Sequence, residues 1–367
     1  MRGARESTTG FWLAAAGWAL CLVVWGGCAA QYVDPIRAAQ ADPKQVSFLF
    51  SDDFERGGLV ASDLPAGKWA VLSPAPGGIL HTASGAAHQG NLGLELVDAH
   101  AAPEGQDEGS VRARFEGLVS VYARYWVRLV ATTSRAGGEI ISGTQSTGPA
   151  GCGVVDVVVN AETGTLWVEG CDATGASTAE PHISQSLEDG WHLVETSVLG
   201  LGGIDGERSL YVDGLLRSDR KGLNLTGLGA VGFSLGEPWA LPATYVGTLQ
   251  FDDVRASVSP LASRVVFLTP ATAQVGVCTL VNLSLRDSVL DAPSAMPWEI
   301  SASLEVHAVN GTFFEDSGCS VPSSRVIFRA GFASAVRFVR FDGPGTAQLS
   351  ATSSDFLGPQ TTLSVLP

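Results

Sequence analysis

The chain has 367 residues, of which 45% are hydrophobic, and a formal net charge of −15. This length predicts two domains, and the hydrophobic content is sufficient to fill two cores. The negative charge argues against nucleic acid or an anionic bilayer surface as a partner. Glycine is abundant, short runs rich in Val, Leu and Thr recur, and no segment after the N-terminus has a sustained helical period, so the sequence predicts an all-β protein.

The first 28 residues have the layout of a secretory signal. Arg2 and Arg5 precede an apolar run over residues 11–25, which two glycines and Cys28 follow. A Cys after two small residues resembles the lipobox of bacterial lipoproteins, which implies lipidation of Cys28. The alternatives are cleavage after Ala30 and a retained membrane anchor, for which the apolar run is short. The sequence therefore predicts an exported protein, held at the cell surface or released, that touches a membrane only through its N-terminus.

Residues 29–46 are rich in Ala, Asp and Pro and predict a loose tether before the first domain. Four cysteines lie beyond it, two in each predicted domain, and this even number predicts one disulfide per domain in an oxidising compartment. A hairpin folded about residues 161–162 sets Cys152 opposite Cys171. Cys278 and Cys319 are then the pair of the second domain. None of them has the C-x-x-C spacing of a zinc site.

The first predicted domain, residues 47–258, begins and ends with similar segments. SFLFSDDFE at 47–55 and TLQFDDVRASV at 248–258 each run from apolar residues into a double aspartate. We expect these two strands to pair, because the opening and closing strands of a β-sandwich often do. Carboxylates at neighbouring strand ends suit Ca²⁺, and this predicts a structural calcium site. Its ligands are Asp52, Asp53, Asp252 and Asp253, with Glu55 as an additional one; the alternative is that these residues cap exposed turns.

Two further segments of this domain alternate with the period of a strand. In SVYARYWVRLV, residues 120–130, one face is apolar and is expected to lie in the core. In the hairpin over 154–168, Val and Leu side chains likewise share a core face, while Asp156 and Trp167 lie opposite. The outward face of the first segment is aromatic and basic, and it consists of Tyr122, Arg124, Trp126 and Arg128.

We interpret the outward aromatic and basic residues as a glycan-binding groove. The indoles of Trp126 and Trp167 can stack on sugar rings, and Arg124 and Arg128 can hold carboxylate or sulfate groups in a bidentate manner. This interpretation requires that both segments belong to one curved sheet. The alternative is that the tryptophans cover a second, smaller core and the arginines pair across strands. The expected polar neighbours in the groove are Glu139, Gln145, Asp156 and Glu195.

Four phrases in residues 47–258 resemble the concanavalin A-like, or laminin G-like, jelly-roll superfamily. They are DDFE at 52–55, WHLVE at 191–195, LYVDG at 210–214 and FDDV at 251–254. The resemblance implies a jelly-roll sandwich, and it agrees with calcium where the terminal strands meet. It does not select a function, because the same fold serves lectins, adhesion modules, glycosidases and lyases.

The second predicted domain, residues 260–367, is read as seven short strands, which indicates an immunoglobulin-like sandwich. It resembles the bacterial Ig-like modules of cell-surface proteins. Together the two domains give an all-β fold, a concanavalin A-like jelly roll followed by a smaller Ig-like sandwich.

Catalytic motifs of the superfamily are absent from the sequence. Laminarinase-like glycosidases carry E-x-D-x-x-E, and alginate-lyase-like members carry Q-x-H and Y-x-K; this chain has no E-x-D, Q-x-H or Y-x-K. The sequence therefore favours an exported protein that binds polysaccharide without cleaving it. One alternative is a lyase or hydrolase that uses Tyr122, Arg124, Glu139 and His192. The other is a structural or adhesion protein with no glycan groove.

Overall fold

The computed structural model describes residues 48–59, 69–72, 78–98, 109–135, 138–148, 153–160, 163–177, 187, 190–237, 245–296, 298–353 and 355–367. All of them belong to one compact unit, residues 42–367. The predicted signal, its Cys28 and the tether lie outside the described residues, as does Cys152. No helix in the described part of the chain is long and apolar enough to cross a membrane.

Antiparallel strands form the first half of the described chain, as its short runs rich in Val and Thr predict. The strands, with the 3₁₀ turn η1, are β1 (Phe48–Asp52), β2 (Ala70–Leu72), β3 (Ile79–Ala83), η1 (Ser84–Ala86), β4 (Gly93–Asp98), β5 (Gly109–Leu118), β6 (Val121–Arg135), β7 (Gly138–Ser146), β8 (Gly153–Asn160), β9 (Leu166–Glu169), β10 (His192–Leu199), β11 (Gly206–Val212), β12 (Leu215–Leu223), β13 (Ala230–Glu237) and β14 (Tyr245–Ser257).

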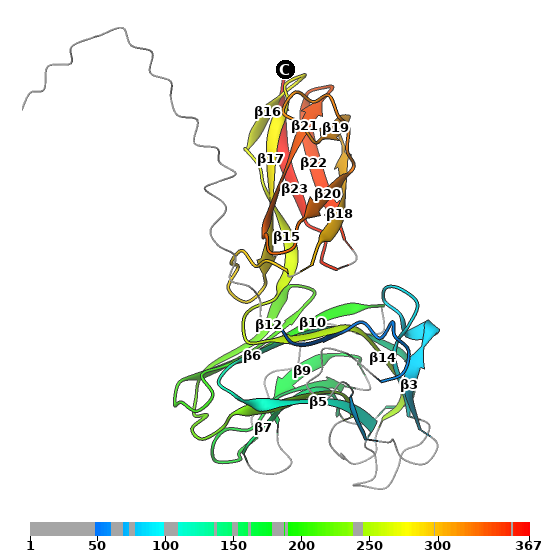
Figure 1. Ribbon diagram of the computed structural model, residues 1–367, viewed down its shortest axis with the longest axis vertical. Helices are drawn as coiled ribbons and strands as arrows, with labels where there is room; N and C mark the ends of the chain where they lie inside the picture. The colour runs from blue at the N-terminus through cyan, green and yellow to red at the C-terminus, as the bar shows by residue number, and fades with distance from the viewer. Residues whose placement is uncertain are drawn as a thin grey trace, which may run out of the picture. The chain divides into compact units, whose positions relative to one another are not determined.

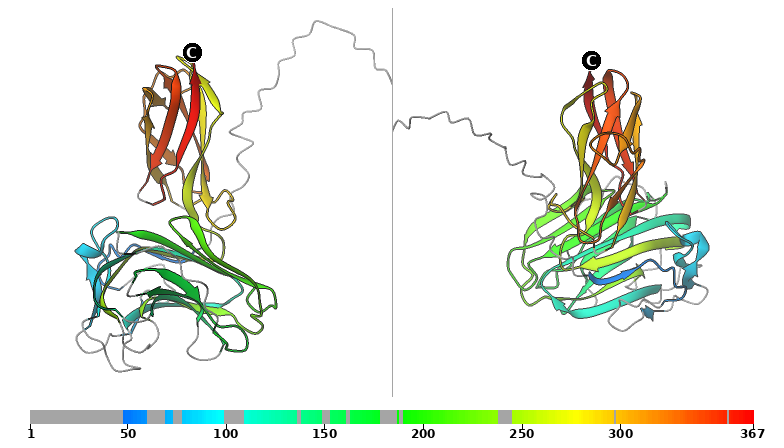
Figure 2. Two further views of the ribbon diagram at one scale, coloured as in Figure 1. Left: turned by 180° about the vertical axis from the view of Figure 1, so that it is seen from behind. Right: turned by 45° about the horizontal axis from the view of Figure 1, so that its top comes forward.

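These strands make two stacked sheets (Figure 1). The eight-stranded sheet has the order β12-β11-β10-β6-β14-β4-β3, with β1 paired to β14, and the six-stranded sheet has the order β2-β5-β13-β7-β8-β9. Both sheets curve in the same sense, and the six-stranded sheet lies on the inner side of the curve (Figures 1 and 2). The outer face of the six-stranded sheet is therefore concave.

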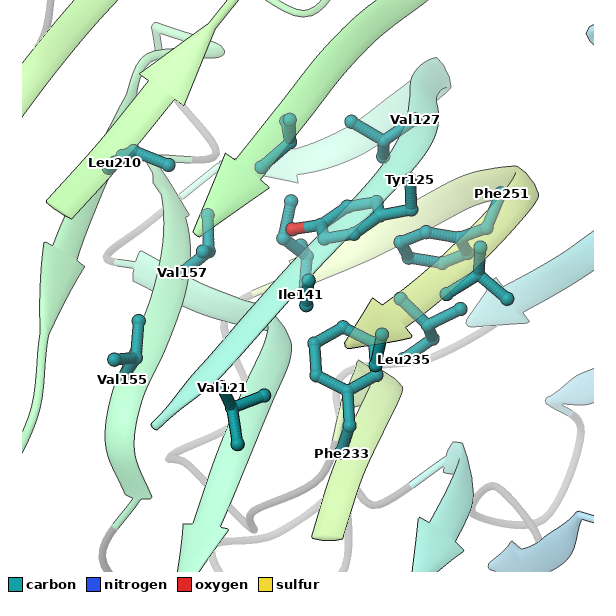
Figure 3. Packing of buried hydrophobic residues seen from close by; sticks show 14 of the residues in the cluster. Val121, Tyr125, Val127, Ile141, Val155, Val157, Leu210, Phe233, Leu235 and Phe251 are labelled. Carbon is teal, nitrogen blue, oxygen red and sulfur yellow. The ribbon is translucent and has the colours of Figure 1, made fainter. Parts of the chain in front are cut away.

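The core of this sandwich lies between the two sheets and is filled by inward side chains from strands of both. Tyr125 is at its centre, with ring centroids 6.1 Å from Phe233 and 6.0 Å from Phe251. Figure 3 shows these rings packed against aliphatic side chains from both sheets. The Tyr125 hydroxyl is paired with the Ser142 hydroxyl at 2.6 Å, so the buried phenol has a partner.

The opening and closing strands of the first sandwich pair, as predicted. In the antiparallel pairing of β1 with β14, Ser51 lies opposite Arg255 and Asp52 opposite Val254. Strand β14 also pairs with β4 and β6, so it is central to the eight-stranded sheet. This places both double aspartates at the same end of neighbouring strands.

The second half of the described chain forms two smaller sheets. The seven predicted strands are all present, and two short strands, β16 and β19, were not predicted. The strands are β15 (Ala262–Leu268), β16 (Thr272–Gln274), β17 (Thr279–Asp287), β18 (Ile300–His307), β19 (Gly311–Phe314), β20 (Arg325–Phe328), β21 (Ser334–Phe341), β22 (Gly345–Thr352) and β23 (Gln360–Leu366).

Each of these smaller sheets contributes one face to a second core. The four-stranded sheet has the order β15-β17-β21-β19, and the five-stranded sheet has the order β16-β23-β22-β18-β20. Aliphatic and Phe side chains of both fill the space between them, separately from the first core. The all-β sandwich prediction is thereby confirmed, whereas membership of the Ig-like family stays a prediction.

The disulfide between Cys278 and Cys319 is present, as predicted, and joins the residue before β17 to the turn after β19. Cys171 is also disulfide-bonded. Its predicted partner, Cys152, lies outside the described residues, although the neighbouring Gly153 accepts a hydrogen bond from the Cys171 backbone N–H at 2.9 Å.

Candidate functional site

The predicted alternation along β6 is correct. Ala123, Tyr125, Val127 and Leu129 all lie in the first core. The side chains of the intervening residues therefore project from the opposite face of the eight-stranded sheet, which we call the outer face of that sheet.

The predicted groove across β6 and β9 is wrong, because these strands belong to different sheets. Strand β6 lies in the eight-stranded sheet and β9 in the six-stranded one, so Trp126 and Trp167 point away from opposite sides of the sandwich. Alternation fixes which residues leave the core, but it does not say which strands pair. The predicted site residues divide accordingly. Tyr122, Arg124, Trp126, Arg128 and Glu195 are on the eight-stranded sheet, and Glu139, Gln145, Asp156 and Trp167 are on strands of the six-stranded sheet.

Arg124 is the residue for which a ligand-binding role fails most clearly. Its side chain is 0% exposed. The guanidinium donates to the backbone carbonyls of Ala262 and Asp355, the latter at 2.7 Å, and its Cζ lies 5.2 Å from the ring centroid of Phe356. All three partners belong to the chain beyond β14. Arg124 therefore holds the second sandwich against the outer face of the eight-stranded sheet.

Other residues of this outer face also contact the second sandwich, and we call this contact region the junction. Glu195 lies opposite Arg124 in the pairing of β10 with β6. Burial raises the pKa of Glu195 to about 7, although the charge of Arg124 and hydrogen bonds from Ser288 and Ser263 act in the other direction. The Tyr211 hydroxyl donates to the Val289 carbonyl at 3.4 Å. The residues that the sequence predicts as a binding surface thus lie in an interface between the two sandwiches.

Trp126 is covered by a different segment. It is 7% exposed, and the imidazole of His88 stacks on it with ring centroids 3.8 Å apart. Arg128 is also held locally, since its guanidinium donates to the Gln250 side-chain carbonyl at 2.6 Å and lies 5.1 Å from the ring of Trp191. This is the alternative in which tryptophans of the outer face cover a smaller core of their own. Trp126 cannot receive a sugar ring in this arrangement.

The alternative catalytic set also does not converge. His192 pairs through Nδ1 with an Asp213 carboxylate oxygen at 2.8 Å. Tyr122 and Arg124 leave the eight-stranded sheet on its outer face, whereas Glu139 lies on β7 of the other sheet. The side chain of Glu139 lies outside the described part of the structure.

The concave outer face of the six-stranded sheet carries a polar row that crosses five strands. In the strand pairings, Arg112 lies opposite Ser234, Ser234 opposite Gly143, Gly143 opposite Asp156, and Asp156 opposite Glu169. Four strand spacings of about 4.8 Å make the row roughly 19 Å long. Its inward neighbours, such as Val111 and Phe233, are in the first core. We call this row, with its neighbours Arg114, Gln145 and Trp167, the concave face site.

Glycines form the floor at the centre of this site. A Cβ at Gly143 would collide with the Asp156 carboxylate, and one at Gly232 would lie 2.7 Å from the Gln145 amide oxygen. The absence of side chains at these positions lets Asp156 and Gln145 lie flat on the sheet. Asp156 is fixed there by the Gly153 N–H, which donates to its carboxylate at 3.2 Å. The centre of the face is therefore lower than its two ends.

Larger side chains stand at the two ends of the row. Arg114 is exposed and Arg112 is half-buried on β5, two residues apart on one face. Trp167 and Glu169 are half-buried on β9 at the other end, and the indole N–H of Trp167 donates to the Glu169 carboxylate at 3.5 Å. Gln145, Asp156 and Trp167 were predicted as binding residues. Arg112 and Arg114 were missed, although the alternation V-R-A-R-F-E at 111–116 contains the signal that identifies them.

Two of the four aspartates predicted as calcium ligands, Asp52 and Asp252, each accept several hydrogen bonds from protein donors. Asp52 accepts hydrogen bonds from the Trp69 indole N–H at 2.6 Å and the Phe54 backbone N–H at 2.9 Å. The carboxylate of Asp252 accepts the backbone N–H groups of three residues, His88, Gln89 and Asp253, at 2.8, 3.0 and 2.8 Å. These are turn-capping roles, the alternative that the sequence left open.

The other two predicted ligands are Asp53 and Asp253, and Glu55 is the additional one. Asp53 caps the Glu55 N–H at 3.2 Å, and Glu55 accepts the Asn91 and Leu92 N–H groups at 2.6 and 2.8 Å. Asp253 contacts His88 and Arg255 at 3.9 and 3.6 Å. Across the residues that the structure describes, no group of three or more His, Cys, Asp or Glu side chains is arranged to hold a metal ion. The calcium site therefore stays a prediction, since Asp52, Asp252 and Glu55 are engaged with protein donors whereas Asp253 Oδ2 accepts no hydrogen bond.

No protein-family model and no curated protein matches the chain. Solved structures that resemble it include an endo-β-1,4-glucuronan lyase from the fungus Trichoderma reesei, at 12% identity, with 58% of this chain and 96% of that chain covered and a TM-score of 0.43. The cellulose-induced protein Cip1 is 16% identical, with 57% and 97% covered and a TM-score of 0.42. Domain 4 of AbnA, an extracellular arabinanase from Geobacillus stearothermophilus solved with arabinotriose, is 15% identical, with 59% and 94% covered and a TM-score of 0.40. The function of this chain is therefore argued from its own side chains.

Proposed function

We propose that the chain is an exported protein that binds an extended, anionic polysaccharide on the concave face site without cleaving it. The observation that carries the proposal is the row from Arg112 to Glu169, which places cationic and aromatic side chains at opposite ends of a low, polar floor. A length of roughly 19 Å suits several sugar residues in line, not a single one.

Each part of the face has a role that suits a glycan. Arg114 is exposed and can form paired hydrogen bonds with a carboxylate or sulfate, and Arg112 stands beside it. Trp167 offers an apolar ring surface whose polar N–H is already directed to Glu169. Gln145 is half-buried and supplies an amide group for sugar hydroxyls, while the buried Asp156 shapes the floor beneath it.

The composition of the sheet supports binding over cleavage. The six strands of this sheet contain no His, Tyr, Lys or Cys in their described segments, so carboxylates are the only side chains there suited to proton transfer near neutral pH. Asp156 and Glu169, the carboxylates of the row, are already hydrogen-bonded to the Gly153 N–H and the Trp167 indole.

The test is affinity electrophoresis of the purified chain in gels that contain alginate, polygalacturonate or neutral laminarin. We expect retardation by the two uronate polymers and much less by laminarin. Trp167→Ala should weaken the retardation at least fivefold, and Arg114→Met should remove the preference for uronates. The matched control is Arg329→Met, which changes an exposed arginine of the second sandwich and should alter nothing.

Two outcomes would contradict the proposal. Retardation that is unchanged in the Trp167→Ala, Arg114→Met double variant would place binding elsewhere. Release of new chain ends from any of the polymers, followed over time, would show cleavage and would favour the lyase or hydrolase alternative.

A further inference from the structure

A cavity of about 470 Å³ lies at the end of β14, on the opposite sheet from the concave face site. Residues of the first sandwich line most of it, and Trp298 and Asp355 of the second sandwich complete it. Its volume is within the range of small-molecule sites in proteins. Nothing in the proposed polysaccharide binding uses this cavity.

The charge of the lining is strongly negative. Among the described residues of the lining, five carboxylates and one guanidinium, that of Arg255, face the cavity. The cavity is therefore suited to a cationic ligand.

Two buried polar atoms in the lining lack hydrogen-bond partners within the described part of the chain. Asp253 is 6% exposed, and its Oδ2 accepts no hydrogen bond, since His88 Nδ1, which also lacks a hydrogen-bond partner, is 3.9 Å away. Arg255 is equally buried, and its Nη1 donates to no acceptor, although Nη2 contacts Asp355 at 3.3 Å. Buried polar groups are nearly always paired, so an unpaired acceptor and an unpaired donor beside one cavity indicate the two halves of a ligand contact.

One wall of the cavity is aromatic. Trp298 is half-buried, and the guanidinium carbon of Arg255 lies 4.7 Å from its ring centroid. An indole at the edge of a polar cavity gives an apolar surface on which a sugar ring or an alkyl chain can pack. Asp53, on the same lining, is exposed and has one carboxylate oxygen that accepts no hydrogen bond among the described residues.

From these observations we infer that the cavity is a binding site for an amino sugar with a free ammonium group. The ammonium donates to Asp253 Oδ2 and to Asp53. A ring hydroxyl accepts from Arg255 Nη1, and the ring packs against Trp298. A free ammonium is required because the acceptors carry charge, and a hydroxyl is required because the arginine can only donate.

The experiment is isothermal titration of the full chain with four probes and with Ca²⁺ alone. We expect D-glucosamine to bind at least tenfold more tightly than D-glucose, N-acetyl-D-glucosamine or ethanolamine. The first two lack a cationic group, and ethanolamine lacks the ring. Asp53→Asn and Asp253→Asn should each weaken glucosamine binding at least tenfold, whereas Asp342→Asn, on an exposed loop of the second sandwich, should leave it unchanged.

Equal affinities for glucosamine and glucose, or an unchanged affinity in the Asp53→Asn chain, would overturn the assignment. Asp53 is exposed, so that variant tests the site without disturbing the fold. Binding of Ca²⁺ without any glucosamine binding would overturn it in favour of a metal site. Trp167→Ala should not affect glucosamine binding. This variant therefore distinguishes ligand binding in the cavity from polysaccharide binding on the concave face site.

Discussion

The two outer faces of the first sandwich look alike in the sequence and differ in the structure. Each alternates core residues with arginines and a tryptophan, Arg124 and Trp126 on β6, and Arg114 and Trp167 on β5 and β9. On the eight-stranded sheet the second sandwich and the segment around His88 cover these side chains, and Arg124 and Trp126 are buried. On the six-stranded sheet, Arg114 is exposed and Trp167 is half-buried. Alternation identifies the residues that leave the core, but a binding face also requires that nothing else covers them.

The difference between the two outer faces can be tested most directly by replacing one arginine with methionine on each face. Arg124→Met removes the donor to two backbone carbonyls and leaves Glu195 without its cationic neighbour, and we expect it to lower the free energy of unfolding by about 3–5 kcal/mol. Arg114→Met should change it by less than about 0.5 kcal/mol, because the side chain is exposed. Urea unfolding of both variants is the measurement. Equal losses in the two would mean that the faces are not distinct.

The tryptophans provide a second, smaller contrast. Trp126→Ala removes a buried indole that His88 stacks on, and it should cost about 3 kcal/mol. Trp167→Ala should cost about 1 kcal/mol or less, while it weakens polysaccharide binding. Thermal unfolding and affinity electrophoresis of the same two proteins give both readouts. A variant of Trp126 that keeps its stability and loses polysaccharide binding would restore the groove predicted from the sequence.

The pH dependence of stability gives a third test, whose effect is spread over a range of pH. Burial holds the folded-state pKa of Glu195 at about 7, above its ordinary value of 4.5, so the folded state keeps a proton that the unfolded chain releases. Because the unfolded chain loses this proton first, the free energy of unfolding falls as the pH rises from about 4.5 to about 7. The contribution of Glu195 to this fall is at most about 1.4 kcal/mol per pH unit. Arg124 and Asp287 are the charged groups that act on Glu195 there.

Glu195→Gln should flatten the stability profile over this pH window, and urea unfolding at several pH values measures it. Glu299→Gln, at an exposed position, serves as the control and should leave the slope as it is. An unchanged slope in Glu195→Gln would show that folding does not raise the pKa of this carboxyl.

Much of the architecture follows from the sequence alone, because alternation with a period of two is a local property. It predicted an all-β chain, the inward side chains of β6 and β8, the pairing of β1 with β14, and the disulfide between Cys278 and Cys319. It also identified Trp167, Asp156 and Gln145 as outward residues of the strands that form the concave face.

Tertiary structure decided the order of the strands in each sheet and which segments pack over each outer face. Strands β6 and β9 belong to different sheets, and whether two strands share a sheet depends on non-local hydrogen bonding that a local pattern does not encode. Arg124 became structural because carbonyls of residues 262 and 355 meet its guanidinium, and the aspartates became caps because segments distant in the sequence place N–H groups on them. Local chemistry determined what each side chain can do, and only the folded chain decided which of them face solvent.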